Sequence, residues 1–181
     1  MKKLQALYEE SKKTGILNVS DMKLTMLPTL PDSIIRLNCS HNQLTTLPEL
    51  PETLTGLNCY NNQLTSLSLP DALTELYCSY NTITTLTLPE SLTHLYCNNN
   101  RITSLSLPDS LVHLYCQENQ LTSLPLLPES LQYVRWNKNP WNAHFTYILN
   151  TPDPFRVIHT YYTNPEVYNY VHNRVTLSHR S

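Results

Sequence analysis

Cysteine recurs at nearly constant intervals through most of this chain, which restricts the folds that it can adopt. The cysteines are Cys39, Cys59, Cys78, Cys97 and Cys116, separated by steps of 20, 19, 19 and 19 residues. The same step leads back to Val19 and forward to Trp136. Self-similarity at a short fixed period is the signature of a solenoid, in which each repeat folds into one coil that stacks on the next. The 181 residues therefore predict one domain of about seven repeats, each 19 or 20 residues long.

Each repeat follows the pattern LxxLxCxxNx(L/I)TxLxLP(D/E), as in LTELYCSYNTITTLTLPE from residue 73 onward. Leu76 and Cys78 lie two positions apart, so a short strand turns both side chains inward. Glu75, Tyr77 and Ser79 then point outward. Because every repeat shares the pattern, the strands are expected to stack as a curved parallel β ladder with a concave outer face.

Asparagine forms a second column three residues after the cysteine column, where the chain must leave the strand. Its members are Asn42, Asn62, Asn81, Asn100, Asn119 and Asn139. An inward Asn side chain is expected to bond the backbone of its own corner and of the neighbouring coil. The rest of a 19-residue coil is too short for a full helix, and recurrent proline favours an extended path. We therefore expect an extended convex side that is poor in helix.

The two ends of a repeat stack need covers, because each end exposes apolar surface. Residues 1–15 are expected to form an N-terminal helical cap that precedes the repeats at 16–140. Over residues 2–14, Leu4, Leu7 and Tyr8 share one helical face, and Gly15 is a stop signal. This helix is predicted to cover the first coil.

Residues 141–181 are expected to form a C-terminal helical cap and tail. Apolar side chains fall at helical spacing at Trp141, Phe145, Ile148 and Leu149. Asn164 followed by Pro165 resembles a second helix start. Two interpretations of residues 151–181 remain open, namely an extension of the cap with a frayed end or a separate binding tail.

The pattern over residues 16–140 resembles the leucine-rich repeats. Phrases such as LPTLPDSI and LPLLPESL resemble the LPX-type class found in secreted effectors of enteric pathogens, and the Cys-bearing units also resemble repeats of giant viruses. The first repeat departs from the pattern by carrying Met22 in the Asn column. The resemblance implies a leucine-rich-repeat solenoid that binds other proteins.

Charge and hydropathy exclude several kinds of partner. Twelve Lys and Arg against fourteen Asp and Glu give a net charge of -2, which disfavours nucleic acid and anionic membranes. The first residues, MKKLQALYEESKK, lack the apolar core of a secretory signal, and no apolar run reaches about 18 residues. We therefore expect a monomer without membrane insertion in the cytoplasm, which for a pathogen or viral protein would be the host cytoplasm.

The cysteines are expected to be buried and reduced. They fall on the inward side of successive strands, and no CxxC pair occurs in the sequence. Neighbouring cysteines about 4.8 Å apart along the ladder do not match disulfide geometry. We interpret them as small core residues, with no metal and no cofactor.

Outward positions form three stripes along the predicted ladder. The first holds Arg36, Gly56, Glu75, His94, His113 and Tyr133. The second holds Asn38, Asn58, Tyr77, Tyr96, Tyr115 and Arg135. The third, after the cysteine column, holds Ser40, Tyr60, Ser79, Asn98, Gln117 and Asn137.

Stacked tyrosines flanked by His and Arg make a rigid amphipathic surface of the kind enriched at interfaces. The predicted partner-binding residues are Tyr77, Tyr96, Tyr115, Glu75, His94, His113, Tyr133 and Arg135. The alternative is that Tyr merely suits strands and spread by repeat duplication. Duplication does not explain why the second stripe changes from Asn to Tyr to Arg.

Glu75, His94 and His113 line up on consecutive strands, which invites a metal-site interpretation. Three ligands in a straight row about 10 Å long do not converge on one ion with bonds of about 2 Å, so no metal is expected there. No nucleophile, base and orienting group can be assembled from the motifs either. We therefore expect no catalytic residues.

Two functions remain as hypotheses. The first is a non-enzymatic protein–protein interaction module, an effector or adaptor in a host cell, that binds its partner on the concave face. The alternative is the substrate-recognition part of an LPX-type ubiquitin-ligase effector that lacks its catalytic domain. The absence of Cys after residue 140 argues against a ligase nucleophile in the chain itself.

Overall fold

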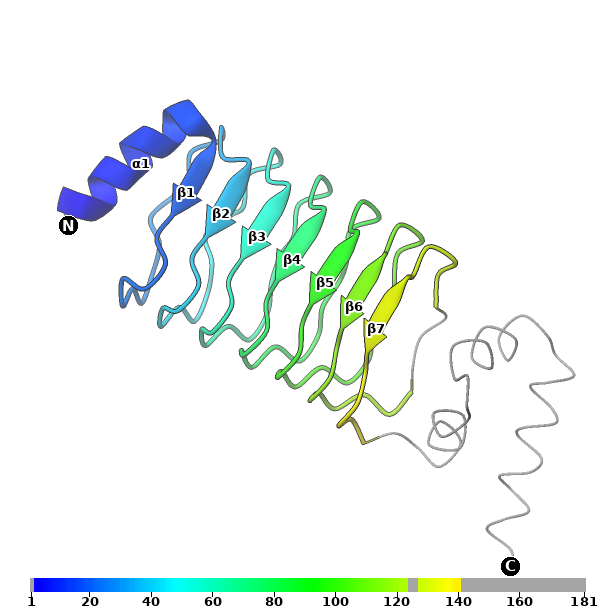
Figure 1. The fold of residues 1–181 in the computed structure, drawn as a ribbon. Coiled ribbons are helices and arrows are strands. Elements are labelled where there is room, and N and C mark those ends of the chain that lie inside the picture. The colour runs from blue at the N-terminus through cyan, green and yellow to red at the C-terminus, as the bar shows by residue number, and fades with distance from the viewer. Residues whose placement is uncertain (1, 124–126, 141–181) are drawn as a thin grey trace, which may run out of the picture.

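The computed structural model describes residues 2–123 and 127–140, which form one helix followed by seven parallel strands (Figure 1). The helix is α1 (Lys2–Thr14), and the strands are β1 (Ile16–Asn18), β2 (Arg36–Asn38), β3 (Gly56–Asn58), β4 (Glu75–Tyr77), β5 (His94–Tyr96), β6 (His113–Tyr115) and β7 (Tyr133–Arg135). Each strand pairs with the strand of the next coil, so the sheet order is the order of the sequence. The predicted repeat solenoid is confirmed.

The core is built from two columns in each coil. The central residue of each strand is a leucine from β1 to β6, and these leucines pair in register from coil to coil. The cysteine that follows each strand from β2 to β6 is fully buried, as predicted. Burying one leucine side chain contributes about 2 kcal/mol, so one column of leucines is a large part of the stability of the stack.

The Asn column bonds backbone groups of two successive coils, as the sequence predicted. The Asn81 Nδ2 group donates to the carbonyl of Cys78 in its own coil (3.1 Å) and to that of Cys59 in the preceding coil (3.1 Å). Its Oδ1 accepts the backbone N–H of Leu64 (2.9 Å). Equivalent bonds are made by Asn62, Asn100 and Asn119. Each Asn therefore ties its own coil to the one before it.

The connections between strands are extended and contain turns but no helix in the described residues, in agreement with the predicted convex side. Proline begins a tight turn in each coil, as where the Leu73 N–H donates to the Pro70 carbonyl (3.2 Å). A serine ladder follows this turn. The Ser91 hydroxyl lies 2.6 Å from the Asp71 carbonyl and 2.7 Å from the Leu73 carbonyl of the preceding coil.

Helix α1 covers the first coil at the N-terminal end of the stack (Figure 1). Its Tyr8 and Ser11 are buried, and Leu4 and Leu7 pack against the core. The Tyr8 hydroxyl donates to the Pro28 carbonyl (3.2 Å), and burial raises the pKa of this phenol to about 12. The helix occupies the range 2–14 predicted for it.

Gly15 ends the helix with φ at +72°, a conformation that glycine adopts without strain. Its carbonyl accepts the N–H groups of Ile35 (2.7 Å) and Arg36 (3.0 Å), which joins α1 to the second coil. The predicted C-terminal cap at 141–181 lies outside the described residues. Across the described part of the chain, no helix has the length and apolar character needed to cross a membrane.

Candidate functional site

The strand face, defined here as the outward side chains of the first and third residues of β1 to β7, brings the predicted binding residues together. The register aligns Glu75, His94, His113 and Tyr133 in one row, and Tyr77, Tyr96, Tyr115 and Arg135 in the next. The two rows lie side by side because the central residue of each strand points into the core. All eight predicted residues thus lie on one surface.

Tyr77, Tyr96 and Tyr115 form a continuous ring stack, called the Tyr stack below. The ring centroids of Tyr77 and Tyr96 are 4.7 Å apart, and those of Tyr96 and Tyr115 are 4.4 Å apart, with interplanar angles of 15° and 16°. These separations are close to the strand spacing of about 4.8 Å, so the rings stack along the solenoid axis and turn their edges outward. Burial raises the pKa of both Tyr77 and Tyr96.

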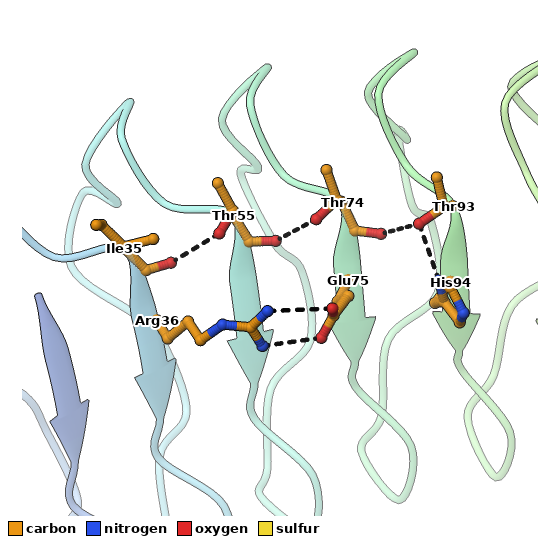
Figure 2. A network of polar contacts seen from close by, with 7 residues as sticks. All are labelled: Ile35, Arg36, Thr55, Thr74, Glu75, Thr93 and His94. Carbon is orange, nitrogen blue, oxygen red and sulfur yellow. Dashed lines mark hydrogen bonds and ion pairs between the residues drawn. The ribbon is translucent and has the colours of Figure 1, made fainter.

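His94 and His113 stack in the neighbouring row, with ring centroids 4.6 Å apart. The Thr93 hydroxyl lies 3.0 Å from the Thr74 carbonyl and 2.8 Å from His94 Nδ1 (Figure 2). Since the hydroxyl has one hydrogen and a carbonyl can only accept, this hydrogen goes to Thr74 and His94 Nδ1 donates to Thr93.

His113 differs from His94 because Val112 precedes it in place of a threonine. His113 Nδ1 is buried and has no hydrogen-bond partner among the residues that the structure describes. Duplicated repeats have thus diverged at this position, and one of the two stacked imidazoles lacks the contact that orients the other.

The C-terminal end of the strand face is formed by Tyr133 and Arg135. The Tyr133 ring lies 5.1 Å from the Tyr115 ring and 6.3 Å from the His113 ring. Arg135 Nε donates to the Tyr133 hydroxyl (2.6 Å), and its guanidinium carbon lies 5.6 Å from the Tyr115 centroid and 5.7 Å from the Tyr133 centroid. The hydrogen bond to Tyr133 raises the pKa of Arg135. Cation–π contacts hold the guanidinium against the end of the Tyr stack.

Glu75 is turned away from the predicted histidine neighbours. Its carboxylate receives two hydrogen bonds from the Arg36 guanidinium, at 3.0 and 3.2 Å, across the intervening strand β3 (Figure 2). The ion pair raises the pKa of Arg36. Arg36 can cross β3 because Gly56 has no side chain; a Cβ at Gly56 would lie 3.3 Å from Arg36 Nη1.

A hollow of about 380 Å³ lies on the N-terminal half of the strand face, and the sequence analysis did not predict it. It is lined by residues that include Asn18, Asn38, Asn58, Gly56 and Tyr77. Asn38 Oδ1 accepts the Ser40 N–H (3.1 Å), and Asn58 Oδ1 accepts the Tyr60 N–H (3.1 Å), so both Nδ2 groups are oriented as donors. The sequence feature that could have predicted this hollow is Gly56, which interrupts an outward column of large side chains.

The third predicted stripe is not uniformly outward. Ser40 and Ser79 were expected to point to solvent, but they are 5% and 3% exposed. The Ser40 hydroxyl donates to Asn38 Oδ1 (2.8 Å), and the Ser79 hydroxyl donates to Asn98 Oδ1 (2.6 Å). The prediction was wrong for both residues because the backbone turns off the strand directly after the cysteine, and small side chains are covered at this bend.

An aromatic edge cluster lies beside the strand face and was also missed by the sequence analysis. It consists of His41, Tyr60 and Tyr80, whose neighbouring ring centroids are 5.0 and 5.3 Å apart. Tyr80 is 48% exposed and has φ at +56°, a conformation in which a bulky residue is unusual. Other coils place Asn61 and Asn99 at this position, so a Tyr there was the available signal.

The cysteine interior offers no reactive thiol. All five cysteines are free and buried, and burial raises the pKa of Cys39 and Cys116 to about 12. Burial also raises the pKa values of Cys59, Cys78 and Cys97 well above their usual range. Within the described ranges, no group of three or more His, Cys, Asp or Glu is arranged to hold a metal ion. The chemistry of the strand face is therefore that of hydrogen bonding and aromatic contact.

Comparison with known proteins identifies similar folds. Residues 91–114 match the Leucine Rich Repeat family. Among solved structures, an effector LRR domain from Shigella is 32% identical, with a TM-score of 0.71 over 84% of each chain. YopM from Yersinia enterocolitica is 38% identical, with a TM-score of 0.67 over 68% of this chain and 28% of that protein.

YopM from Yersinia pestis, described as a leucine-rich effector protein, is 29% identical, with a TM-score of 0.65 over 76% of this chain and 47% of that one. This chain thus spans less than half of the length of either YopM. No curated protein sequence matches it.

Proposed function

Since this chain belongs to the leucine-rich-repeat family, with bacterial effectors among its structural relatives, we propose that it is a non-enzymatic module whose strand face binds a protein partner. The observation that carries the proposal is the continuous aromatic surface made by the Tyr stack, the His94–His113 pair and the Tyr133–Arg135 end. Tyr and Arg are the residue types that most often dominate binding energy at protein interfaces.

Stacking prepares this surface for binding. Association usually costs about 0.5–1.5 kcal/mol for each side chain that must be ordered at the interface. The rings of the Tyr stack are already ordered by stacking, with neighbouring ring centroids 4.4 to 4.7 Å apart. Arg135 is held by its hydrogen bond to Tyr133. Binding a partner therefore requires little further ordering of these side chains, because folding has already ordered them.

The setting that we propose is a host cell. The solved structures that resemble this chain include effector proteins of Yersinia and Shigella. By this similarity, the chain would act as a monomeric effector or adaptor in host cytoplasm. Its role would be recognition, because the strand face carries donors and aromatic rings but no activated nucleophile.

A second candidate is the recognition part of a ubiquitin-ligase effector. The observation in its favour is that the Shigella structure, 84% covered by this chain, is described as one domain of an effector. In that case the same strand face would select the substrate, and the transfer chemistry would lie on another domain. A ubiquitin-transfer assay on the gene product isolated from its source, with purified activating and conjugating enzymes, separates the two candidates, because only a product that carries a ligase domain alongside these repeats transfers ubiquitin.

The test of the proposed function is capture of partners from a host-cell lysate. The Tyr77→Ala, Tyr96→Ala, Tyr115→Ala variant should lose the captured protein, with affinity lowered by on the order of 100-fold, because three central aromatic contacts are removed. Isothermal titration calorimetry with the identified partner then measures the loss directly.

The matched control carries three substitutions in the connections after β4 and β5, Thr85→Ala, Thr87→Ala and Ser104→Ala, all at exposed positions. It should capture the same protein as the wild type. Equal thermal melting of both variants excludes unfolding as the cause. Capture that survives the tyrosine substitutions in a folded variant would refute the strand face as the interface.

A further inference from the structure

The charges on the strand face are unevenly compensated. Its full charges at strand positions β1 to β7 are those of Arg36, Glu75 and Arg135. Arg36 and Glu75 neutralise each other through two hydrogen bonds. Arg135 is hydrogen-bonded to the hydroxyl of Tyr133, and no carboxylate among the described residues forms an ion pair with it. The C-terminal half of the strand face therefore carries one net cation.

The Arg135 guanidinium is held in a fixed place with one edge available. Nε is occupied by the Tyr133 hydroxyl at 2.6 Å, and the group lies 5.6 Å from the Tyr115 ring centroid. The two terminal Nη groups make no hydrogen bond with the described residues. A planar fork of this kind binds a carboxylate through two parallel hydrogen bonds, and less freedom is lost when the fork is already ordered.

The surroundings of Arg135 also favour an acceptor. The Tyr stack turns the positive edges of its rings outward, and its protonated hydroxyls can donate. Further along the strand face, Asn38 and Asn58 use Oδ1 to accept backbone N–H groups, which leaves their Nδ2 groups as donors. The surface thus offers many donors and one uncompensated positive charge.

We propose that the partner is a polypeptide that places the carboxylate of an Asp or Glu side chain on Arg135 and lays a planar or apolar side chain against the Tyr stack. This inference rests on the proposed function and specifies the chemistry of the partner. A polyanion fits poorly, because a single cation at one end of a protein of net charge -2 cannot hold a row of phosphates. From Tyr77 to Arg135 is three strand spacings, about 14 Å, which four or five extended residues span.

The experiment uses displayed random peptides of 12 residues selected on the whole chain. We expect enriched peptides to contain Asp or Glu near an aromatic or apolar residue. For the best peptide, Arg135→Gln should raise Kd by on the order of 10- to 100-fold, as expected for a charged hydrogen-bonded pair. Replacing the acidic residue of the peptide by its amide should have the same effect, and combining both changes should add little more.

Two further protein variants distinguish binding by the oriented Arg135 guanidinium from a general effect of net charge. Arg101→Gln removes one cation from an exposed position outside the strand face and should leave Kd nearly unchanged. Tyr133→Phe keeps the ring but removes the hydroxyl that holds Nε, and should weaken binding by a smaller factor than Arg135→Gln. Circular dichroism melting verifies that each variant is folded.

The outcomes distinguish this inference from the proposed function. Binding that is lost in the Tyr77, Tyr96 and Tyr115 alanine variant but unchanged in Arg135→Gln would keep the strand face as the interface and overturn the carboxylate assignment. Enrichment of basic or wholly apolar peptides would overturn it as well. Peptides that bind the wild type and both variants with the same Kd would refute the proposed function itself. A selection without enrichment would do so as well.

Discussion

At the scale of single residues, the two stacked histidines have the same place in their coils and different surroundings. The Thr93 hydroxyl contacts His94 Nδ1 at 2.8 Å, whereas Val112 offers no such contact and His113 Nδ1 is buried without a partner in the described part of the chain. The backbone geometry is equivalent, because the Val112 N–H donates to the Thr93 carbonyl (2.8 Å) as the Thr93 N–H donates to the Thr74 carbonyl (2.9 Å). A hydroxyl at position 112 would meet the same acceptor and the same ring nitrogen.

Val112→Thr should therefore raise the free energy of unfolding by about 1 kcal/mol, because it adds a hydrogen bond and Thr has nearly the same shape as Val. Thr93→Val should lower it by a similar amount or slightly more, because His94 Nδ1 then loses its partner. Urea denaturation of both variants measures the two changes. A loss of stability in Val112→Thr would show that no hydrogen bond forms between His113 Nδ1 and the new hydroxyl.

At the scale of the coil, two side-chain ladders fasten each repeat to its neighbour. The Asn column bonds the corner after the strand, and the serine column bonds the turn that begins with proline. Both ladders use side chains to satisfy backbone groups that a strand of three residues leaves unpaired. This explains how coils with so little regular secondary structure stack in register.

Asn81→Ala should lower the free energy of unfolding by about 3 kcal/mol. The substitution leaves the Leu64 N–H buried without its acceptor, which costs about 1–3 kcal/mol. It also removes one of two Asn donors from each of the Cys59 and Cys78 carbonyls, which keep their bonds from Asn62 and Asn100 and lose about 1 kcal/mol each. The control Gln63→Ala, at an exposed position in the preceding coil, should change stability by less than about 0.5 kcal/mol. Chemical denaturation of both proteins checks the difference, and equal stabilities would contradict the ladder as a main fastening of the coils.

Ala72 interrupts the serine column, whose other members include Ser91, Ser110 and Ser130. By analogy with Ser91, a hydroxyl at position 72 would lie near the carbonyls of Glu52 and Leu54. Ala72→Ser should therefore raise the free energy of unfolding by about 1 kcal/mol. Ser91→Ala is the reverse experiment and should cost about as much. Thermal melting compares the pair, and a destabilised Ala72→Ser would show that the coils around position 72 are spaced differently.

At the scale of the whole molecule, five thiols lie in one continuous row through the core. Burial raises the pKa of Cys39 and Cys116 from the usual 9.0 to about 12, and the other three shift in the same direction. Above pH 9 the unfolded chain releases protons that the folded chain retains. The free energy of unfolding is therefore unaffected by these groups below pH 9 and falls as the pH rises toward 12.

The slope in this window is about 1.4 kcal/mol per pH unit for each thiol, or about 7 kcal/mol per pH unit for all five. The protein should thus unfold steeply between pH 9 and 12, as followed by circular dichroism. Cys78→Val removes one thiol and should reduce the slope by about 1.4 kcal/mol per pH unit, whatever its effect on stability at neutral pH. A pH dependence unchanged by this substitution would refute the thiols as its cause.

The sequence alone determined the repeat, the parallel ladder, the inward Leu, Cys and Asn columns, the helix at residues 2–14 and the rows that carry Tyr77, Tyr96 and Tyr115. These features depend on spacing along the chain, and a solenoid places equal positions of successive coils side by side, so the period is enough to predict them.

Only the tertiary structure decided how side chains use the space between coils. It turned Glu75 toward Arg36 across Gly56, 39 positions from Arg36, and it covered Ser40 and Ser79. It also joined Tyr60 to the edge cluster. Periodicity specifies the face on which a residue lies. The direction of a side chain depends on which neighbours are large, small or charged one or two coils away, and that is settled only when the coils pack.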